Sequence, residues 1–235
     1  MAAIIISLLL DPITLDNENK SGQDRKLSPK LLVATFKHLL SSPVQVLLIP
    51  ITLYSGIEQA LLQGDFTKSY ITCTLGIWNL GYVMICYGVV DAICSLLFGR
   101  LVQYIGHIPF FVLAFITHGA LQVVFLLWTP TKGQEVLFYV FAGLWGMGDA
   151  VIQTQVNALY GNIFSNKAEA AFANYRLWES VGFMVTYAYN DYLCTYTKLY
   201  IAMASLGLSV VCYFAVEIVT WRTKRNTASQ MDGST

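Results

Sequence analysis

Hydrophobic residues occur along this chain in long runs that short polar turns separate. Six runs follow residue 43, at roughly residues 43–63, 71–99, 108–129, 136–161, 170–190 and 199–219. As an α-helix each run could cross the hydrocarbon core of a bilayer, which takes about 20 residues. The pattern therefore predicts an all-α membrane protein, with a six-helix transmembrane bundle over residues 43–219.

Composition supports a membrane environment rather than water. The 235 residues are 56% hydrophobic and 12% charged, and the mean hydropathy is +0.56. Soluble domains carry about 25% charged residues, and their long surface helices have a charged outer face. None of the six runs has such a face. The formal net charge of zero gives no support for nucleic-acid binding, so we expect the lipid bilayer to be the surroundings of this chain.

The remaining segments flank the predicted bundle. Residues 1–10, MAAIIISLLL, are apolar but too few to span a bilayer, and we interpret them as the remnant of a spanning helix. Residues 11–42 mix both charges with glycine and proline, which is typical of a linker, with a short amphipathic helix at 30–40. Residues 220–235 form a polar tail.

The distribution of basic residues predicts the orientation. If six helices alternate, ten basic residues lie on one side and three on the other. The first group is Lys20, Arg25, Lys26, Lys30, Lys37, Arg100, Lys167, Arg222, Lys224 and Arg225; the second is Lys68, Lys132 and Lys198. Because cytosolic loops are enriched in lysine and arginine, both termini, the linker and the tail should be cytosolic.

Several polar side chains fall inside the predicted spans, where burial of an ionisable group is unfavourable by about 2.5–3.5 kcal/mol or more. Asp149, Gln153 and Asn157 are spaced four apart and share one helix face. Glu58 and Asp91 lie in the first two spans. These five residues are candidates for an intramembrane ion or solute path. They could equally form hydrogen bonds between helices without any transport role.

Local spacing suggests partners for some of these groups. Asp91 stacks with Tyr87 and Ser95, and either hydroxyl could bond to it; Glu58 has Tyr54 one turn before it. Arg176 and Glu179 are three residues apart, as in a structural ion pair. A stripe of small residues lets a neighbouring helix approach closely, and it consists of Ala142, Gly146 and Ala150.

The remaining candidate chemistry is limited. The five cysteines and three histidines show no spacing typical of a metal site or a nucleophilic triad, so we expect no metal, no cofactor and no enzymatic activity. Cys73 and Cys194 should both lie on the non-cytosolic side. They are candidates for a disulfide, because disulfides persist there, or they are free thiols.

One loop resembles a motif of the major facilitator superfamily. The stretch GRLVQYIGH at 99–107 is similar to G-x-L-x-D-x-x-G-R/K, with Gly99, Leu101 and Gly106 in place and His107 at the basic position. Gln103 occupies the acidic position. The charge contact that gates a classical transporter of this superfamily is therefore missing from the motif.

Four longer stretches resemble the unc-93-like family. They are LYSGIEQALLQGDFTKSY at 53–70, GYVMICYGVVDAICSLLFGR at 81–100, GLWGMGDAVIQTQVNALYG at 143–161 and AFANYRLWESVGF at 171–183. The resemblance implies a major-facilitator-like fold of twelve helices in two halves, of which this chain would be the C-terminal half. The chain would then work with a missing N-terminal half or as a homodimer, or be an inactive truncation.

The same resemblance implies a function. The family includes a regulatory subunit of a potassium channel and an escort of Toll-like receptors, so we expect a non-enzymatic regulator or escort of a membrane partner such as a potassium channel, in the plasma membrane. The alternative is a secondary, proton-linked solute transporter in which Glu58, Asp91 or Asp149 exchanges protons. A carboxylate of that kind must reach water from each side in turn, at a midplane site between two halves.

Overall fold

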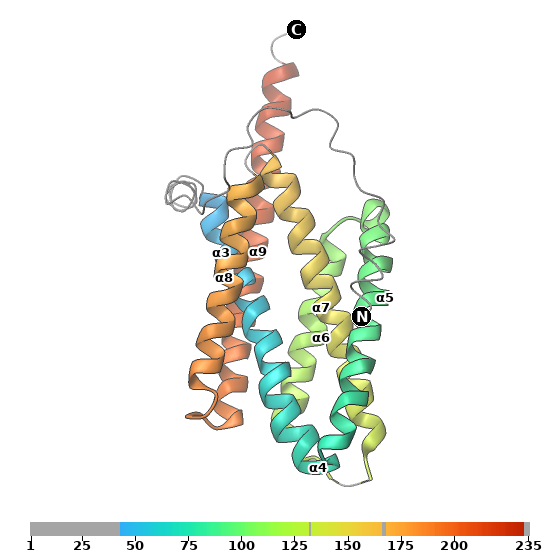
Figure 1. Cartoon of the computed structure of the whole chain (residues 1–235). Helices are drawn as coiled ribbons and strands as arrows, with labels where there is room; N and C mark the ends of the chain where they lie inside the picture. The colour runs from blue at the N-terminus through green and yellow to red at the C-terminus, as the bar shows by residue number, and fades with distance from the viewer. Residues whose placement is uncertain (1–42, 132, 166–167, 233–235) are drawn as a thin grey trace, which may run out of the picture.

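Apolar runs in a bilayer form helices because helices satisfy every backbone hydrogen bond within one segment. The computed structural model describes residues 43–131, 133–165 and 168–232, and the regular structure found there is helical (Figure 1). The elements are α3 (Pro43–Ala60), η1 (Leu61–Thr72), α4 (Cys73–Leu75), α5 (Ile77–Ile105), α6 (Ile108–Leu127), α7 (Glu135–Ile163), α8 (Ala168–Tyr189) and α9 (Thr195–Asp232).

The first span is longer than the sequence pattern predicts. α3, η1 and α4 form one continuous helical stretch from Pro43 to Leu75, with η1 wound as a π-helix. The turn predicted at residues 64–70 is therefore wrong. Its charged residues lie within the helix, where Asp65 pairs with Lys198 of α9 and Lys68 pairs with Asp191 of the α8–α9 connection. The break comes at Gly76, whose φ of 84° favours glycine.

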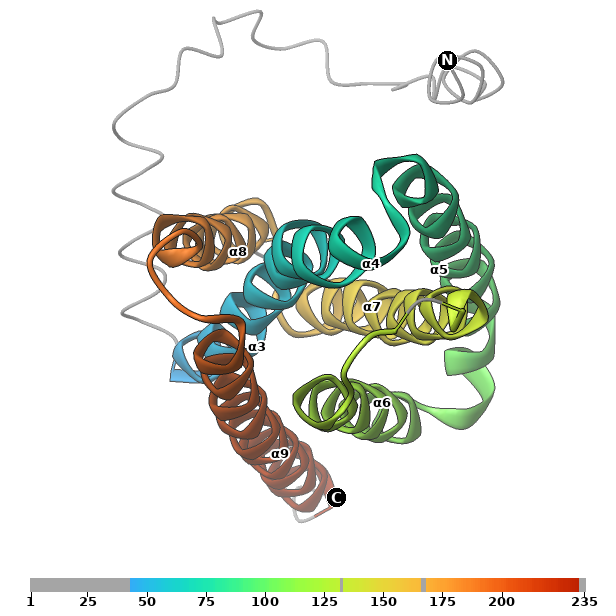
Figure 2. The ribbon, with the colours of Figure 1, turned by 90° about the horizontal axis from the view of Figure 1, so that it is seen from below.

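The long helices pack as two groups of three, and each group combines helices from the first and the second half of the bundle sequence. α3 packs against α8 and α9, whereas α7 packs against α5 and α6. Seen end-on, α3 lies between α8 and α9, and α7 lies between α5 and α6 (Figure 2). In chain order the helices form two triplets, α3–α5–α6 and α7–α8–α9. The first helix of each triplet contacts the second and third helices of the other triplet.

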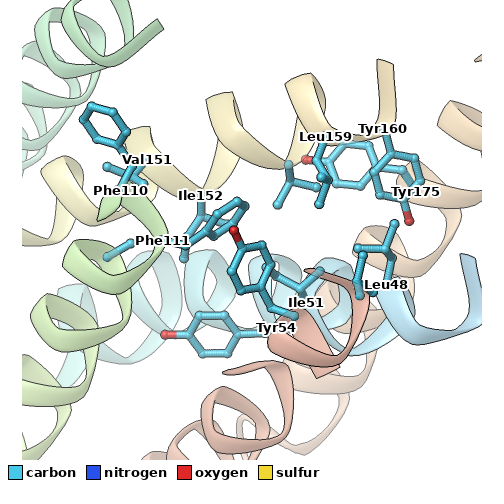
Figure 3. Close-up of a cluster of buried hydrophobic side chains, with 14 of the residues drawn as sticks. Leu48, Ile51, Tyr54, Phe110, Phe111, Val151, Ile152, Leu159, Tyr160 and Tyr175 are labelled. Atoms are coloured by element: carbon cyan, nitrogen blue, oxygen red, sulfur yellow. The ribbon is translucent and has the colours of Figure 1, made fainter. Parts of the chain in front are cut away.

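Large apolar and aromatic side chains fill the space between these groups. In the cluster of Figure 3, Leu48, Ile51 and Tyr54 from α3 face Ile152 and Tyr160 from α7. A second cluster continues along the bundle and centres on the stacked rings of Phe125 and Trp145, 5.6 Å apart. Close aromatic packing of this kind holds helices together in lipid, where no hydrophobic effect drives them together.

The membrane character of the bundle is confirmed. Within the described residues, five segments are long and apolar enough to span a bilayer: Pro43–Leu75, Ile77–Ile105, Ile108–Leu127, Glu135–Ile163 and Thr195–Arg222. α8, which carries Arg176 and Glu179, is not among them. It is the sixth long helix of the bundle and packs against α3, with Glu179 buried and the Arg176 side chain 60% exposed.

The two ends of the described chain lie at the same end of the bundle. Successive segments alternate in direction, so Pro43 and the end of α9 lie at one end of the bundle, and the α4 and α8–α9 connections lie at the other (Figure 1). α9 continues past the predicted end of its span at 219 to Asp232. The predicted spanning remnant at 1–10, the linker at 11–42 and its helix at 30–40 lie outside the described residues.

Candidate functional site

The polar residues predicted inside the membrane converge at mid-height of the bundle. Asp149 is the central residue of the 29-residue helix α7, and Glu58 lies at the middle of the 33-residue span Pro43–Leu75. Both are buried, with 4% and 0% of their surface exposed. Two acidic side chains therefore meet where the surrounding bilayer is least polar.

Asp149 accepts hydrogen bonds from two neighbouring helices. The Tyr87 hydroxyl of α5 donates to Oδ2, and Gln59 Nε2 of α3 donates to Oδ1 at 3.3 Å. Tyr87 thus bonds to Asp149 rather than to Asp91, which lies one turn further along its own helix. The two donors tie α7 to both α5 and α3.

Glu58 lies against a histidine that the sequence did not single out. His118 on α6 is fully buried, and its Nδ1 lies 3.2 Å from Glu58 Oε2. Tyr54 Oη lies 3.0 Å from the same Nδ1 and accepts a bond from Gln122 Nε2 at 3.0 Å. On the other ring edge, His118 Nε2 lies 3.4 Å from the Trp145 carbonyl oxygen. Tyr54 therefore bonds to His118 and not to Glu58.

A second polar cluster lies one turn away toward the α7–α8 connection. Gln153 Nε2 donates to Ser55 Oγ at 2.9 Å and to Glu179 Oε1 at 3.2 Å, and it joins α3, α7 and α8. Tyr175 donates to Gln153 Oε1 at 2.8 Å. Arg176 Nη1 lies 2.6 Å from Glu179 Oε2, which is the predicted ion pair.

Asn157 and Asp91 are less involved than their spacing suggested. Asn157 Nδ2 donates to the Gln153 carbonyl of its own helix at 2.6 Å. Asp91 Oδ1 accepts from Ser95 Oγ at 3.5 Å, and Asp91 also interacts electrostatically with Asp149. Asp91 is only partly buried, so it forms the outer side of the acidic group.

The predicted stripe of small residues is used inside the bundle. Ala142, Gly146 and Ala150 are all buried. A Cβ atom on Gly146 would lie 2.7 Å from the Tyr87 carbonyl oxygen, so α5 approaches α7 at that point. The same contact brings Tyr87 within reach of Asp149.

Two close contacts that depend on glycine escaped the sequence analysis. Gly56 on α3 and Gly182 on α8 lie against each other, and a Cβ on Gly56 would lie 2.1 Å from the Glu179 carbonyl oxygen. A Cβ on Gly148 would lie 2.3 Å from His118 Nε2, so this glycine makes room for the imidazole. Single glycines within apolar helices gave no signal of either contact.

Cys73 and Cys194, the candidates for a disulfide or for free thiols, are free and exposed. η1 and the start of α9 contact each other through Ser69 Oγ and Thr195 Oγ1, 3.3 Å apart. Nearby, Lys198 Nζ lies 2.5 Å from Asp65 Oδ1 in a buried ion pair that the sequence analysis missed. The residues described contain no group of three or more metal-binding side chains.

Comparison with known proteins identifies the family. The sequence model described as "Ion channel regulatory protein UNC-93" matches residues 1–214. The chain belongs to the UNC-93 family. Protein unc-93 homolog A of Xenopus laevis is 47% identical over 230 residues, which cover 97% of this chain and 50% of the relative. The human homolog A is 46% identical over 93% of this chain and 48% of its own length.

A more distant UNC-93 relative has a name that states a role. The putative potassium channel regulatory protein unc-93 of Caenorhabditis elegans is 34% identical over 92% of this chain and 31% of its own length. The chain spans about half the length of the homolog A proteins that it matches. The names of the family and of the nematode relative describe regulatory proteins.

Proposed function

We propose that this UNC-93 chain is a non-enzymatic regulator or escort that binds a membrane partner such as a potassium channel. The family description and the name of the nematode relative support channel regulation. We further propose that it acts in the plasma membrane with both termini in the cytosol. The start of α3 and the ends of α5 and α9 lie at one end of the bundle, and η1 and the start of α9 lie toward the other (Figure 1). Arg100 and Arg222 belong to the first set of segments, and Lys68 and Lys198 belong to the second.

The observation that carries this proposal is the open face of α5. Among the five apolar spans, α5 is the least buried by the rest of the chain. Gly81, Gly88, Ala92 and Gly99 are exposed and fall on one face of it, with the half-buried Ser95 between them. Apart from the adjoining residues and backbone of α5 itself, no atom of the described residues lies within 4 Å of a Cβ built on Gly81, Gly88 or Gly99.

Such a face suits a transmembrane helix of another protein. Small residues let two backbones approach closely, which is a main source of helix association in lipid. The stripe on α7 cannot serve this purpose because α5 already covers it. We therefore assign partner binding to the open face of α5, where a spanning helix of the partner would pack against Gly88 and Ala92.

Co-purification from membranes tests this function. The chain is expressed with candidate potassium-channel subunits and pulled down in mild detergent. We expect a channel subunit to co-purify with the chain and to be lost when Gly88→Leu and Ala92→Leu close the stripe. Gly207→Leu on α9, where a Cβ also meets nothing within 4 Å, is the matched control and should retain the partner. Equal recovery with both variants would overturn the assignment to α5.

The buried carboxyl groups favour a second candidate, a proton-linked secondary transporter. The exchanged triplets of helices are what the inverted repeats of a major-facilitator half would produce, and in such proteins substrates bind near the midplane between two halves. Glu58 and Asp149 lie at that height. This function needs a facing half, supplied either by the N-terminal half of a longer protein or by a second copy in a homodimer.

One substitution separates the two candidates. Asp149→Asn removes a buried carboxylate and leaves the α5 face unchanged, so a regulator should still bind its partner. A transporter should lose pH-dependent uptake while the amount of protein at the cell surface stays the same. Uptake and co-purification measured on the same cells decide between them.

A further inference from the structure

The centre of the bundle holds more acid than base. Among the described residues, the ion pairs formed by lysine and arginine involve Asp65, Asp191 and Glu179. Glu58, Asp91 and Asp149 have no lysine or arginine partner in that set. His118 is the basic group beside them. Whether all three carboxyl groups can be ionised there depends on which hydrogen-bond donors surround Glu58.

The bonds of His118 indicate that its ring is neutral. The Trp145 carbonyl oxygen can only accept, so Nε2 carries a hydrogen and donates to it. Tyr54 Oη already accepts from Gln122, so its own hydrogen is free to point at Nδ1. The bonds from Gln122 to Tyr54, from Tyr54 to His118 and from His118 to Trp145 can all form when Nδ1 is an acceptor. A neutral imidazole offers no positive charge to Glu58.

Glu58 has little hydrogen-bonding support as an anion. Neither of its oxygens receives a hydrogen bond of normal geometry from the part of the chain that the structure describes. Trp145 Nε1, which interacts with Glu58, also lacks a partner of normal geometry. An ionised carboxylate buried without donors is strongly unfavourable, and such a group takes up a proton instead. The lone pair of His118 Nδ1, 3.2 Å away, adds repulsion against a negative Glu58.

Asp149 provides the acceptor that a protonated Glu58 needs. The two carboxyl groups interact with each other, and Gln59, the residue after Glu58, donates to Asp149 Oδ1 at 3.3 Å. Asp149 already accepts from Tyr87 and Gln59, and a third donor would satisfy it as an anion. Two adjacent carboxyl groups in a dry site do not both ionise, and they hold one proton between them.

We propose that Glu58 and Asp149 form a proton-binding site at the middle of the membrane, in which Glu58 carries one exchangeable proton and donates it to Asp149. His118 keeps Glu58 neutral, and Asp91 offers a partly exposed route by which the proton can leave. This site does not depend on whether the chain regulates a partner or transports a solute. The titratable groups that face it are Tyr54 on α3, Tyr87 and Asp91 on α5, His118 on α6, and Tyr175, Arg176 and Glu179 on α8.

Infrared spectroscopy of the purified chain in lipid nanodiscs tests the site without any substitution. At neutral pH we expect the carbonyl band of a protonated carboxyl group. The band should shift when glutamate is labelled with ¹³C in its side-chain carboxyl, and again when water is exchanged for D₂O. The absence of a protonated band, or one that does not respond to the glutamate label, would overturn the proposal. A band that never shifts in D₂O would rule out exchange.

Substitutions then assign the band to residues. Glu58→Gln should abolish it, whereas Glu169→Gln, at an exposed position of α8, should leave it unchanged. Asp149→Asn should keep the band but move it to higher wavenumber, because an amide oxygen is a weaker acceptor than a carboxylate. A band that survives in Glu58→Gln contradicts the assignment. A band that does not move in Asp149→Asn contradicts the sharing of the proton.

Discussion

Gly182 on α8 lies directly against Gly56 on α3. A Cβ atom on Gly182 would be 3.2 Å from the Gly56 Cα and 2.4 Å from the Leu53 carbonyl oxygen. Both contacts involve backbone, which cannot swing aside as a flexible side chain can. The approach of α8 to α3 brings Glu179 beside Ser55 and Gln153. The second polar cluster therefore depends on two glycines that carry no polar group themselves.

Replacing Gly182 should loosen this contact. We expect Gly182→Ala to lower stability by about 1–3 kcal/mol, as overpacking of a close contact does. Thermal unfolding of the detergent-solubilised protein measures the effect. Gly207→Ala on α9 is the control, because its Cβ meets nothing within 4 Å, and it should unfold at or slightly above the wild-type temperature. Equal behaviour of the two variants would show that α3 and α8 are not in contact as described.

Gly146 offers a second test on a different pair of helices. Gly146→Ala would push α5 away from α7, since the new Cβ lies 2.7 Å from the Tyr87 carbonyl oxygen, and it would withdraw the Tyr87 hydroxyl from Asp149. Gly143→Ala, one turn earlier on α7, meets Val90 at an ordinary 3.6 Å and should be tolerated. Cross-linking of cysteine pairs placed on α5 and α7 should weaken only in the first variant.

The buried Lys198–Asp65 pair should matter far more than the exposed Lys68–Asp191 pair. Lys198 Nζ donates to Asp65 and to two oxygens of Asn190, and both side chains of the pair are about 4% exposed. Lys198→Met leaves a buried carboxylate unpaired, which destabilises by about 3–5 kcal/mol.

The exposed pair supplies the control. Lys68→Met should lower stability by about 0–1 kcal/mol, because water screens that pair. A Lys198→Met, Asp65→Asn double variant should recover much of the loss of the single variant. Unfolding curves in detergent compare the four proteins, and equal losses for Lys198 and Lys68 would contradict the buried pair.

Thiol labelling tests the proposed orientation. Cys73 and Cys194 are free and exposed. Cys73 begins α4 and Cys194 directly precedes α9, and these segments lie at the end of the bundle opposite the start of α3. With cytosolic termini, a membrane-impermeant maleimide added to intact cells should label both, and the Cys73→Ser, Cys194→Ser variant should lose that label. Labelling that requires permeabilised cells would reverse the orientation. Cys86, Cys94 and Cys212 lie partly buried within helices and should react more slowly.

Much of the fold followed from hydrophobic pattern alone. Runs of this length and composition permit only spanning helices in lipid, so six helices and most of their bounds were predictable. The first turn was not, because Asp65 and Lys68 look like loop residues until their partners Lys198 and Asp191 are known. Helical spacing likewise predicted the Arg176–Glu179 pair, since both residues lie on one element.

Contacts between elements were decided only by the tertiary structure. The spacing of Asp149, Gln153 and Asn157 showed that they share a face, but nothing local indicated that Tyr87 and Gln59 would bond to Asp149. His118 lay in an apolar run with no sign that it would face Glu58. The sequence alone determined which side chains must avoid lipid, because the free energy of moving a side chain from water into lipid depends on the residue type. Which partners satisfy those groups depends on how the helices cross, and that is set by small residues such as Gly56, Gly146 and Gly182 acting across the whole bundle.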